Sequence, residues 1–98
     1  MTIEQKKNGS ALLIALEGRL DTMTAPQLEA VLKEALPGVE ALTFDLEKLD
    51  YISSAGLRML LSAQKTMNRQ GTMKVKNANE MILEIFEVTG FCDILTIE

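Results

Sequence analysis

Residues 41–70 read ALTFDLEKLDYISSAGLRMLLSAQKTMNRQ and combine a predicted strand with a predicted helix. The strand is expected within 39–46, because this short apolar segment is bounded by turn-forming and charged residues. Residues 47–52 are interpreted as a connecting stretch. Ser53-Ser54-Ala55-Gly56 opens the helix, whose apolar residues recur at helical spacing until Gln70-Gly71 ends it. Such a strand–helix unit is typical of α/β folds with parallel strands.

The residues before this unit predict a β-hairpin. Asn8-Gly9 is a strong signal for a two-residue turn, so residues 2–7 and 10–17 are expected to pair as neighbouring strands. Gly18-Arg19-Leu20-Asp21 is interpreted as the break that ends the second strand. The hairpin therefore supplies two strands ahead of the first helix.

A first helix is expected between Thr24 and Pro37-Gly38. Thr24 is a candidate N-cap, Gln27 is placed to complete a capping box with it, and Pro26 is tolerated in the first turn. The apolar residues at helical spacing are Leu28, Val31, Leu32, Ala35 and Leu36. Pro37-Gly38 then stops the helix.

The C-terminal part predicts a strand, a helix and a closing strand. Residues 72–76 alternate as a short strand, and Asn77 or Asn79 caps a helix that Gly90 ends. Residues 91–97 are expected to form the last strand. The chain, residues 1–98, is therefore predicted to be one α/β domain with the order β-β-α-β-α-β-α-β. Its sheet is expected to be mixed but mostly parallel, with the helices packed on it.

The composition excludes several classes of function. The net charge is −4, and no basic stripe is present to offset the phosphate backbone of a nucleic acid. The apolar runs are shorter than the roughly 20 residues that a membrane span needs. Residues 1–6 also lack the apolar core of a signal peptide. We therefore expect a cytoplasmic protein that binds neither nucleic acid nor membrane.

The chain has no histidine and a single cysteine, Cys92. The absence of histidine removes Ser-His-Asp and Cys-His nucleophiles and every zinc site that contains histidine. Cys92 lies in an apolar stretch and is interpreted as a small buried hydrophobe. Because no set of charged residues converges in the sequence, we expect a binding module without cofactor or metal rather than an enzyme.

The helix start at Ser53 and Ser54 is the candidate functional site. In α/β sheets, functional residues gather at the carboxyl ends of parallel strands, where helices begin. Backbone N–H groups at such a helix start attract an anion, and a phosphate there would add about −1.5 to −2 charge without opposing the helix. The competing interpretation is that these serines only cap the helix. The glycine and lysine spacing of a Walker phosphate loop is missing.

Four short motifs together resemble the STAS domain family, and within it the bacterial anti-sigma factor antagonists. They are Gly18-Arg19-Leu20-Asp21, Phe44-Asp45-Leu46, Ser53-Ser54-Ala55-Gly56-Leu57 and Val88-Thr89-Gly90-Phe91. The resemblance spans nearly the whole chain and implies the same order of elements. It also implies a protein-binding role in the regulation of transcription.

The resemblance implies that Ser54 is the phosphorylated residue. Gly56-Leu57 fixes the register of the family motif, in which the phosphorylated serine follows an aspartate. Here Ser53 stands where many members carry that aspartate, and Arg58 stands where some carry a second glycine. Arg58 could pair with the phosphate or with an acidic partner, or it could simply be solvated. The expected partner-binding residues are Asp21, Ser53, Gly56, Leu57 and Arg58.

Acidic residues outside the serine motif have two interpretations each. Asp21 matches a family aspartate in a loop that lines the partner-binding face, but a turn-forming aspartate that caps the next segment is an equal alternative. Asp45 matches a recurrent acidic position at a strand end, where a structural, hydrogen-bonding role is favoured. Asp50 and Tyr51 lie in the expected connecting stretch and are expected to shape the same face.

Together these residues imply a phosphorylation switch. The unphosphorylated face around Ser54 and Asp21 would bind a serine kinase that is itself the anti-sigma factor, and would thereby release the sigma factor. Phosphorylation of Ser54 would weaken this docking, and a phosphatase would reset the system. Two other interpretations stay open. One is a non-switching STAS accessory or docking subunit of a transport or stress-signalling complex, and the other is a nucleotide-binding module that uses the Ser54 helix start.

The C-terminus departs from the family pattern. Members usually carry a last helix after the final strand, whereas this chain stops at Glu98. Uncovered apolar surface would favour an extra partner or self-association. The protein is therefore expected to be a monomer or a weak dimer.

Overall fold

Four strands form one mixed sheet in the computed structural model, which describes all residues from Met1 to Glu98. They lie side by side in sequence order: β1 (Thr2–Asn8), β2 (Ala11–Leu20), β3 (Ala41–Ile52) and β4 (Thr72–Lys76). β1 is antiparallel to β2, whereas β2, β3 and β4 run parallel to one another. Each parallel connection contains a helix, because a tight turn cannot bring the chain back to the same end of the sheet.

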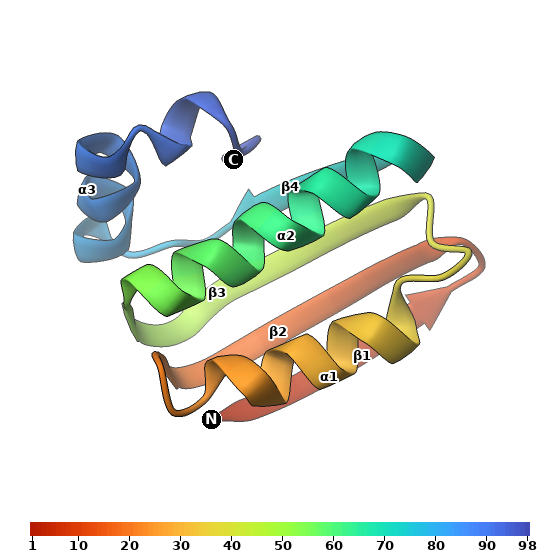
Figure 1. The fold of residues 1–98 in the computed structure, drawn as a ribbon, viewed down its shortest axis with the longest axis horizontal. Coiled ribbons are helices and arrows are strands. Elements are labelled where there is room, and N and C mark those ends of the chain that lie inside the picture. Colours follow the sequence, from red (N-terminus) through yellow and green to blue (C-terminus); the bar gives the residue numbers. More distant parts are fainter.

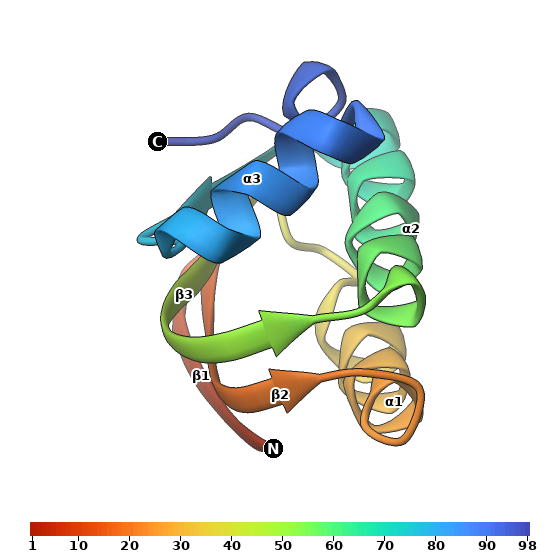
Figure 2. The ribbon, with the colours of Figure 1, turned by 90° about the vertical axis from the view of Figure 1, so that its left-hand side faces the viewer.

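Three helices accompany the sheet. α1 (Ala25–Ala35) connects β2 to β3, and α2 (Ser54–Gln70) connects β3 to β4. These two helices lie side by side on one face of the sheet (Figure 1, Figure 2). α3 (Glu80–Thr89) follows beyond the end of β4. None of the helices combines the length and the apolar character that crossing a membrane requires.

The core lies between the helices and the sheet. Alternate strand residues point into it, as in β2, where Leu12, Ile14 and Leu16 are buried and the intervening residues are not. Leu28 of α1 and Leu60 of α2 are fully buried on the helix side. Each such side chain stabilises the fold by about 1.5–3 kcal/mol relative to an exposed one. The alternation therefore determines which face of each strand turns toward the helices.

The segment after α3 differs from the prediction. The α/β class and the order β-β-α-β-α-β-α are confirmed, but residues 91–97 do not form a last strand. Phe91–Asp93 form a 3-10 helix, and the segment meets the sheet only at a single bridge between Val75 and Ile97. Gly90 ends α3 with a left-handed φ of 80°, which turns the chain into this tight helix and delays its return to β4.

β2 and β3 are longer than predicted. Gly18-Arg19-Leu20 continues β2, and residues 47–52 continue β3 rather than connecting it to α2. The register between the two strands shifts near Gly18, whose φ of 103° interrupts the regular pleat. This irregularity breaks the alternation that the sequence pattern relies on. Leu20 and Ile52 end the two strands as a buried pair.

Two further predictions are wrong: the position of the hairpin turn and the burial of Cys92. The hairpin forms, but Asn8 pairs with Ala11, so the turn residues are Gly9 and Ser10 rather than Asn8 and Gly9. Gly9 has a φ of 63°, as the first position of a tight hairpin turn requires. Cys92 is exposed rather than buried, because it lies in the 3-10 helix and not in a strand that packs on the core.

Gly71 is required where α2 meets β4. A Cβ atom at this position would overlap the carbonyl group of Glu40, which accepts a hydrogen bond from the N–H of Thr72 at 2.9 Å. We predict that Gly71→Ala lowers the free energy of unfolding by about 2–4 kcal/mol, because the backbone would have to move. Urea unfolding followed by circular dichroism measures this loss.

The matched control is Gly38→Ala. Gly38 has a φ of 84°, and nothing lies within 4 Å of a Cβ built there. This substitution should cost only about 1 kcal/mol, for the left-handed conformation alone. Equal losses in the two variants would show that the close approach at Gly71 is not required.

Candidate functional site

The two serines at the start of α2 play different roles. Ser53 is the N-cap, and its hydroxyl oxygen accepts a hydrogen bond from the N–H of Gly56 at 3.4 Å. Ser54 is the first helical residue, and its side chain is exposed and forms no hydrogen bond within the protein. The capping interpretation therefore applies to Ser53 and leaves the hydroxyl of Ser54 available to another molecule.

α2 begins where β2 and β3 end together. Leu20 and Ile52 are paired at these strand ends, and the N–H of Ser53 donates to the C=O of Leu20 at 2.9 Å. Gly56 is buried against the same two residues. A Cβ atom on Gly56 would lie 2.7 Å from Cγ1 of Ile52 and 2.8 Å from Cγ of Leu20. This close packing fixes the first turn of α2 and leaves Ser54 on its solvent side.

Gly56 and Leu57 lie beneath the site rather than on its surface. Both are buried, and Leu57 belongs to the hydrophobic core. The resemblance implied that they contact a partner, but their burial makes them residues that hold the helix start in place. Ser54 and Arg58 are exposed, whereas Ser53 is half-buried.

An anion on Ser54 would have a favourable electrostatic environment. The N–H groups of Ser54 and Ala55 lie in the first turn, where no earlier turn supplies carbonyl partners, and their dipoles attract negative charge. Arg58 belongs to neither of the two ion pairs in the structure. Because residues four apart are neighbours on a helix, its guanidinium can pair with a phosphate on Ser54.

Asp21 holds the turn that follows β2. Its Oδ1 accepts hydrogen bonds from the N–H groups of Met23 at 3.0 Å and Thr24 at 3.2 Å. The hydroxyl of Thr24 accepts from the N–H of Asp21 at 2.9 Å and donates to the C=O of Arg19 at 2.8 Å. Thr24 therefore closes a turn with Asp21 and not the capping box that was predicted with Gln27, whose amide bonds elsewhere.

These contacts favour the ionised form of the carboxyl group of Asp21. Partial burial alone would raise the pKa of Asp21, but the hydrogen bonds from Thr24 and Met23 outweigh this effect and lower the pKa below its usual value. The guanidinium of Arg19, whose Nε lies 3.7 Å from Oδ2, adds to the lowering of the pKa. The turn-forming interpretation of Asp21 is therefore supported, and the residue places a negative charge directly after Leu20, whose C=O accepts the hydrogen bond from Ser53 at the start of α2.

Two surface features at this end of the sheet have no clear signal in the sequence. The guanidinium of Arg19 stacks on the ring of Tyr51, with Cζ 4.4 Å from the ring centroid, and the pair joins the ends of β2 and β3. Met23 is 87% exposed in the turn that Asp21 holds. Single exposed apolar residues are common, but Met23 lies in the turn after β2, at the same end of the sheet as the start of α2, and its flexible side chain suits contact with a partner.

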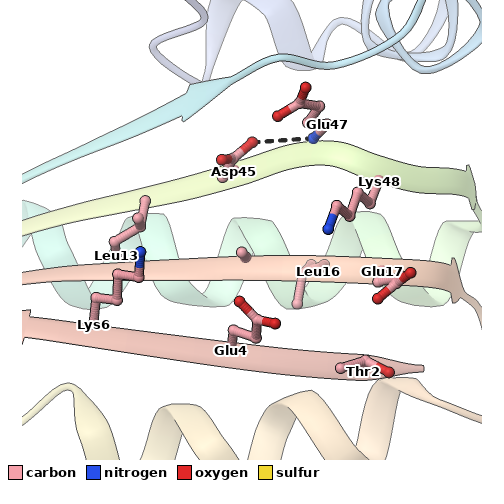
Figure 3. A pocket seen from close by; sticks show the side chains of 10 residues that line it. Thr2, Glu4, Lys6, Leu13, Leu16, Glu17, Asp45, Glu47 and Lys48 are labelled. Carbon is pink, nitrogen blue, oxygen red and sulfur yellow. Dashed lines mark hydrogen bonds between the residues drawn. The ribbon is translucent and has the colours of Figure 1, made fainter.

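Asp45 lies away from this site, within β3 and on the sheet face opposite α1 and α2 (Figure 3). Its Oδ1 accepts hydrogen bonds from the N–H of Glu47 at 3.1 Å and from the amide of Asn77 at 3.0 Å. Burial alone would raise the pKa of Asp45, but these hydrogen bonds, helped by the charges of Lys76 and Lys48, lower it. A structural role for Asp45 is therefore supported, although the residue is not at a strand end.

A shallow hollow on the same sheet face is separate from the Ser54 site. It encloses about 190 Å³, and its lining includes Glu4 and Lys6 of β1 and Asp45 of β3. Figure 3 shows that Glu4 and Lys6 both project from β1 on this face. None of the predicted phosphorylation or partner-binding residues lines the hollow, so the site at α2 is a surface and not part of this concavity.

The two serines should respond differently to truncation. We predict that Ser53→Ala lowers the free energy of unfolding by about 0.5–2 kcal/mol, because α2 loses its cap. Ser54→Ala removes only an exposed hydroxyl and should change the free energy of unfolding by less than about 0.5 kcal/mol. Urea unfolding compares the two variants. A larger loss in Ser54→Ala than in Ser53→Ala would contradict the assignment of the cap.

Comparison with known sequences identifies related proteins. The chain matches the family model described as "Mlab, STAS domain" over residues 3–96. BtrV of Bordetella bronchiseptica, assigned as an anti-sigma factor antagonist, is 34% identical over 99 residues, which cover 99% of this chain and 85% of BtrV. The anti-sigma-B factor antagonist of Bacillus subtilis is 26% identical over 98 residues, which cover 99% of this chain and 90% of that protein.

Solved structures share the fold. The anti-sigma factor antagonist SpoIIAA in its unphosphorylated form superposes with a TM-score of 0.78 at 17% identity, covering 99% of this chain and 87% of SpoIIAA. SpoIIAA of Bacillus in its phosphorylated form gives a TM-score of 0.77 at 18% identity, covering 99% and 91%. At these identities the likeness concerns the fold alone. The family model, however, matches nearly every residue, and this chain therefore belongs to the STAS domain family.

Proposed function

We propose that this chain is an anti-sigma factor antagonist whose docking is switched off by phosphorylation of Ser54. The observation that carries the proposal is the free, exposed hydroxyl of Ser54 at the start of α2, next to a serine that already caps the helix. BtrV and the Bacillus subtilis relative bear the names of anti-sigma factor antagonists. SpoIIAA, which shares the fold, has been solved in a phosphorylated form. These names describe regulators that act by binding proteins.

The docking surface, which we call the Ser54 face, consists of Asp21, Met23, Ser53, Ser54 and Arg58. It combines an exposed apolar side chain, an ionised carboxylate and an exposed guanidinium around one free hydroxyl. A partner with an apolar pocket for Met23 and a basic group for Asp21 would complement it. Because the free hydroxyl lies within this face, we infer that the partner is an anti-sigma factor that is also the serine kinase.

Phosphorylation of Ser54 would weaken docking through charge. The phosphate adds about −1.5 to −2 charge close to the carboxylate of Asp21. The basic group of the partner would already be engaged by Asp21, so docking would desolvate the phosphate without a further partner cation to match it. A loss of about 2–4 kcal/mol would lower the affinity roughly 30- to 1,000-fold, which is enough for a switch.

The same phosphate would leave the scaffold intact. Ser54 is exposed, so the added group displaces no core side chain. The helix N-terminus attracts the negative charge, and Arg58 supplies a nearby cation. The modification therefore changes what can dock on the Ser54 face and not whether the domain is folded.

This chain performs no chemistry in the proposed cycle. The kinase binds ATP and transfers its terminal phosphoryl group to Oγ of Ser54, and a phosphatase removes it again. Docking of the unphosphorylated face on the anti-sigma factor competes with the sigma factor, which is released to direct RNA polymerase to its genes. The role implies a cytoplasmic location, where bacterial transcription takes place.

The position of the phosphate is the first test. Incubation with the cognate anti-sigma factor kinase and ATP should place a phosphate on Ser54, because it is the one of the two serines at the start of α2 whose hydroxyl does not cap the helix. Ser54→Ala should abolish the modification, whereas Ser53→Ala should retain it. Peptide mass spectrometry locates the phosphate. A phosphate on Ser53, or undiminished phosphorylation of the Ser54→Ala protein, would refute the site assignment.

The effect of charge on docking is the second test. Ser54→Glu should lower the affinity for the anti-sigma factor at least about tenfold, because it puts a fixed negative charge in the interface. The matched control is Ser62→Glu, which adds the same charge at an exposed position of α2 about two turns further along. Isothermal titration calorimetry measures both affinities, and circular dichroism checks that both variants are folded.

The control also separates two explanations. If Ser62→Glu binds like the wild type while Ser54→Glu does not, the position of the charge decides the affinity. Wild-type affinity in Ser54→Glu would rule out gating by charge. An equal loss in both variants would show that net charge, and not the Ser54 face, controls docking.

A further inference from the structure

We propose that a second copy of this chain pairs with the first along the free edge of β1, in one antiparallel register. β1 is an outer strand of the sheet and pairs only with β2. All of its residues except Ile3 are exposed. At the opposite edge of the sheet, β4 is partly covered by the bridge between Val75 and Ile97, whereas β1 has no such cover. The proposal does not rest on the function proposed for Ser54.

The hairpin determines which way each residue of β1 directs its backbone groups. Asn8 pairs with Ala11 across the turn, and the residues next to a two-residue turn form a hydrogen-bonded pair. Even-numbered residues of β1 therefore bond to odd-numbered residues of β2. On the other side of β2, the alternation requires even-numbered residues to bond to β3. The C=O of Ser10, just before β2, accordingly accepts a hydrogen bond from the N–H of Ala41 in β3.

Odd-numbered residues of β1 consequently present their N–H and C=O groups to solvent. These residues are Ile3, Gln5 and Lys7. No backbone hydrogen bond outside the helices and strands engages any of them. Three alternate residues with unpaired backbone groups along one edge of an extended strand are a template for another strand.

The charges of β1 select one register. When Gln5 faces Gln5 of the second copy, the outward residues meet as hydrogen-bonded pairs, and Glu4 of each copy faces Lys6 of the other. Glu4 and Lys6 then form close pairs with Cα atoms about 4.5 Å apart. Sliding one strand by two residues brings Glu4 against Glu4 or Lys6 against Lys6. Sliding it by one residue places odd-numbered residues, whose backbone groups face outward, opposite even-numbered residues, whose backbone groups face β2. Both shifted registers are therefore less favourable than the one with Gln5 opposite Gln5.

The remaining side chains of β1 are compatible with this register. Ile3 lies opposite Lys7 of the second copy, whose methylene stem can cover it while the ammonium group stays in water. The two Gln5 amides face each other and can exchange hydrogen bonds. Edge strands are often protected by charges that repel a second copy. The alternating signs of Glu4 and Lys6 instead attract a copy in this one arrangement.

The resulting dimer leaves the Ser54 face accessible. Pairing at β1 extends the sheet within its own plane, whereas α2, whose first residue is Ser54, follows β3, an inner strand of the sheet (Figure 1). Each dimer would therefore carry two accessible Ser54 faces.

Charge-swap variants test the register. In sedimentation equilibrium from about 10 µM to about 1 mM, the wild type should show a monomer–dimer equilibrium. Glu4→Lys and Lys6→Glu each place like charges opposite one another and should raise the dissociation constant about tenfold or more. The double variant Glu4→Lys/Lys6→Glu restores opposite charges and should recover the wild-type constant. A wild type that stays monomeric at about 1 mM would overturn the proposal, as would a double variant as weak as the singles.

A proline separates edge pairing from folding. The N–H of Gln5 faces outward, so Gln5→Pro removes no hydrogen bond of the monomer but blocks the partner strand. This variant should be monomeric at all of these concentrations, with a circular dichroism spectrum and Tm close to those of the wild type. A dimer that survives Gln5→Pro would show that the interface lies elsewhere. Loss of the fold in Gln5→Pro would contradict the outward direction of this N–H group and with it the proposal.

Discussion

The site depends on how closely the start of α2 approaches the ends of β2 and β3. Gly56 packs against Leu20 and Ile52 with no space for a side chain, and the N–H of Ser53 bonds to the C=O of Leu20. Because these contacts fix the first turn of α2, the hydroxyl of Ser53 caps the helix and Ser54 lies at the surface. The exposed hydroxyl is therefore a direct consequence of strand–helix packing, and no cavity or movable loop is needed to present it.

The electrostatics of this end of the sheet follow from the backbone. The first turn of α2 directs N–H groups outward and tolerates an anion. The neighbouring turn directs N–H groups at the carboxyl of Asp21 and keeps it charged at neutral pH. A phosphate on Ser54 would thus be stabilised by its own helix, and it would add to the negative charge that Asp21 places at this end of the sheet. In the proposed switch, the added charge alters docking while the core beneath it, including Gly56 and Leu57, stays in place.

Local signals in the sequence predicted most of the fold, whereas features that depend on contacts between distant segments were missed. A serine cap at the start of α2 and the alternative of Asn79 as the cap of α3 are local signals, and the structure contains both caps. The lengths of β2 and β3 depend on pairing across the register shift near Gly18, which no single segment reveals. The motif pointed to Ser54, but only the hydrogen bonds show which serine caps. Met23 follows no periodic pattern, so its exposure was visible only in three dimensions.

The central claim is that the fold accepts a phosphate on Ser54, so that the modification changes docking alone and not the scaffold. Comparison of ¹H–¹⁵N NMR spectra of the unphosphorylated and phosphorylated protein tests it most directly. The account predicts that chemical-shift changes stay within residues 21–24 and 53–58, and that amide exchange in the strands is unchanged. Shifts that spread to core residues such as Phe44 and Phe86, with faster amide exchange there, would show that the phosphate disrupts the fold and would contradict the account.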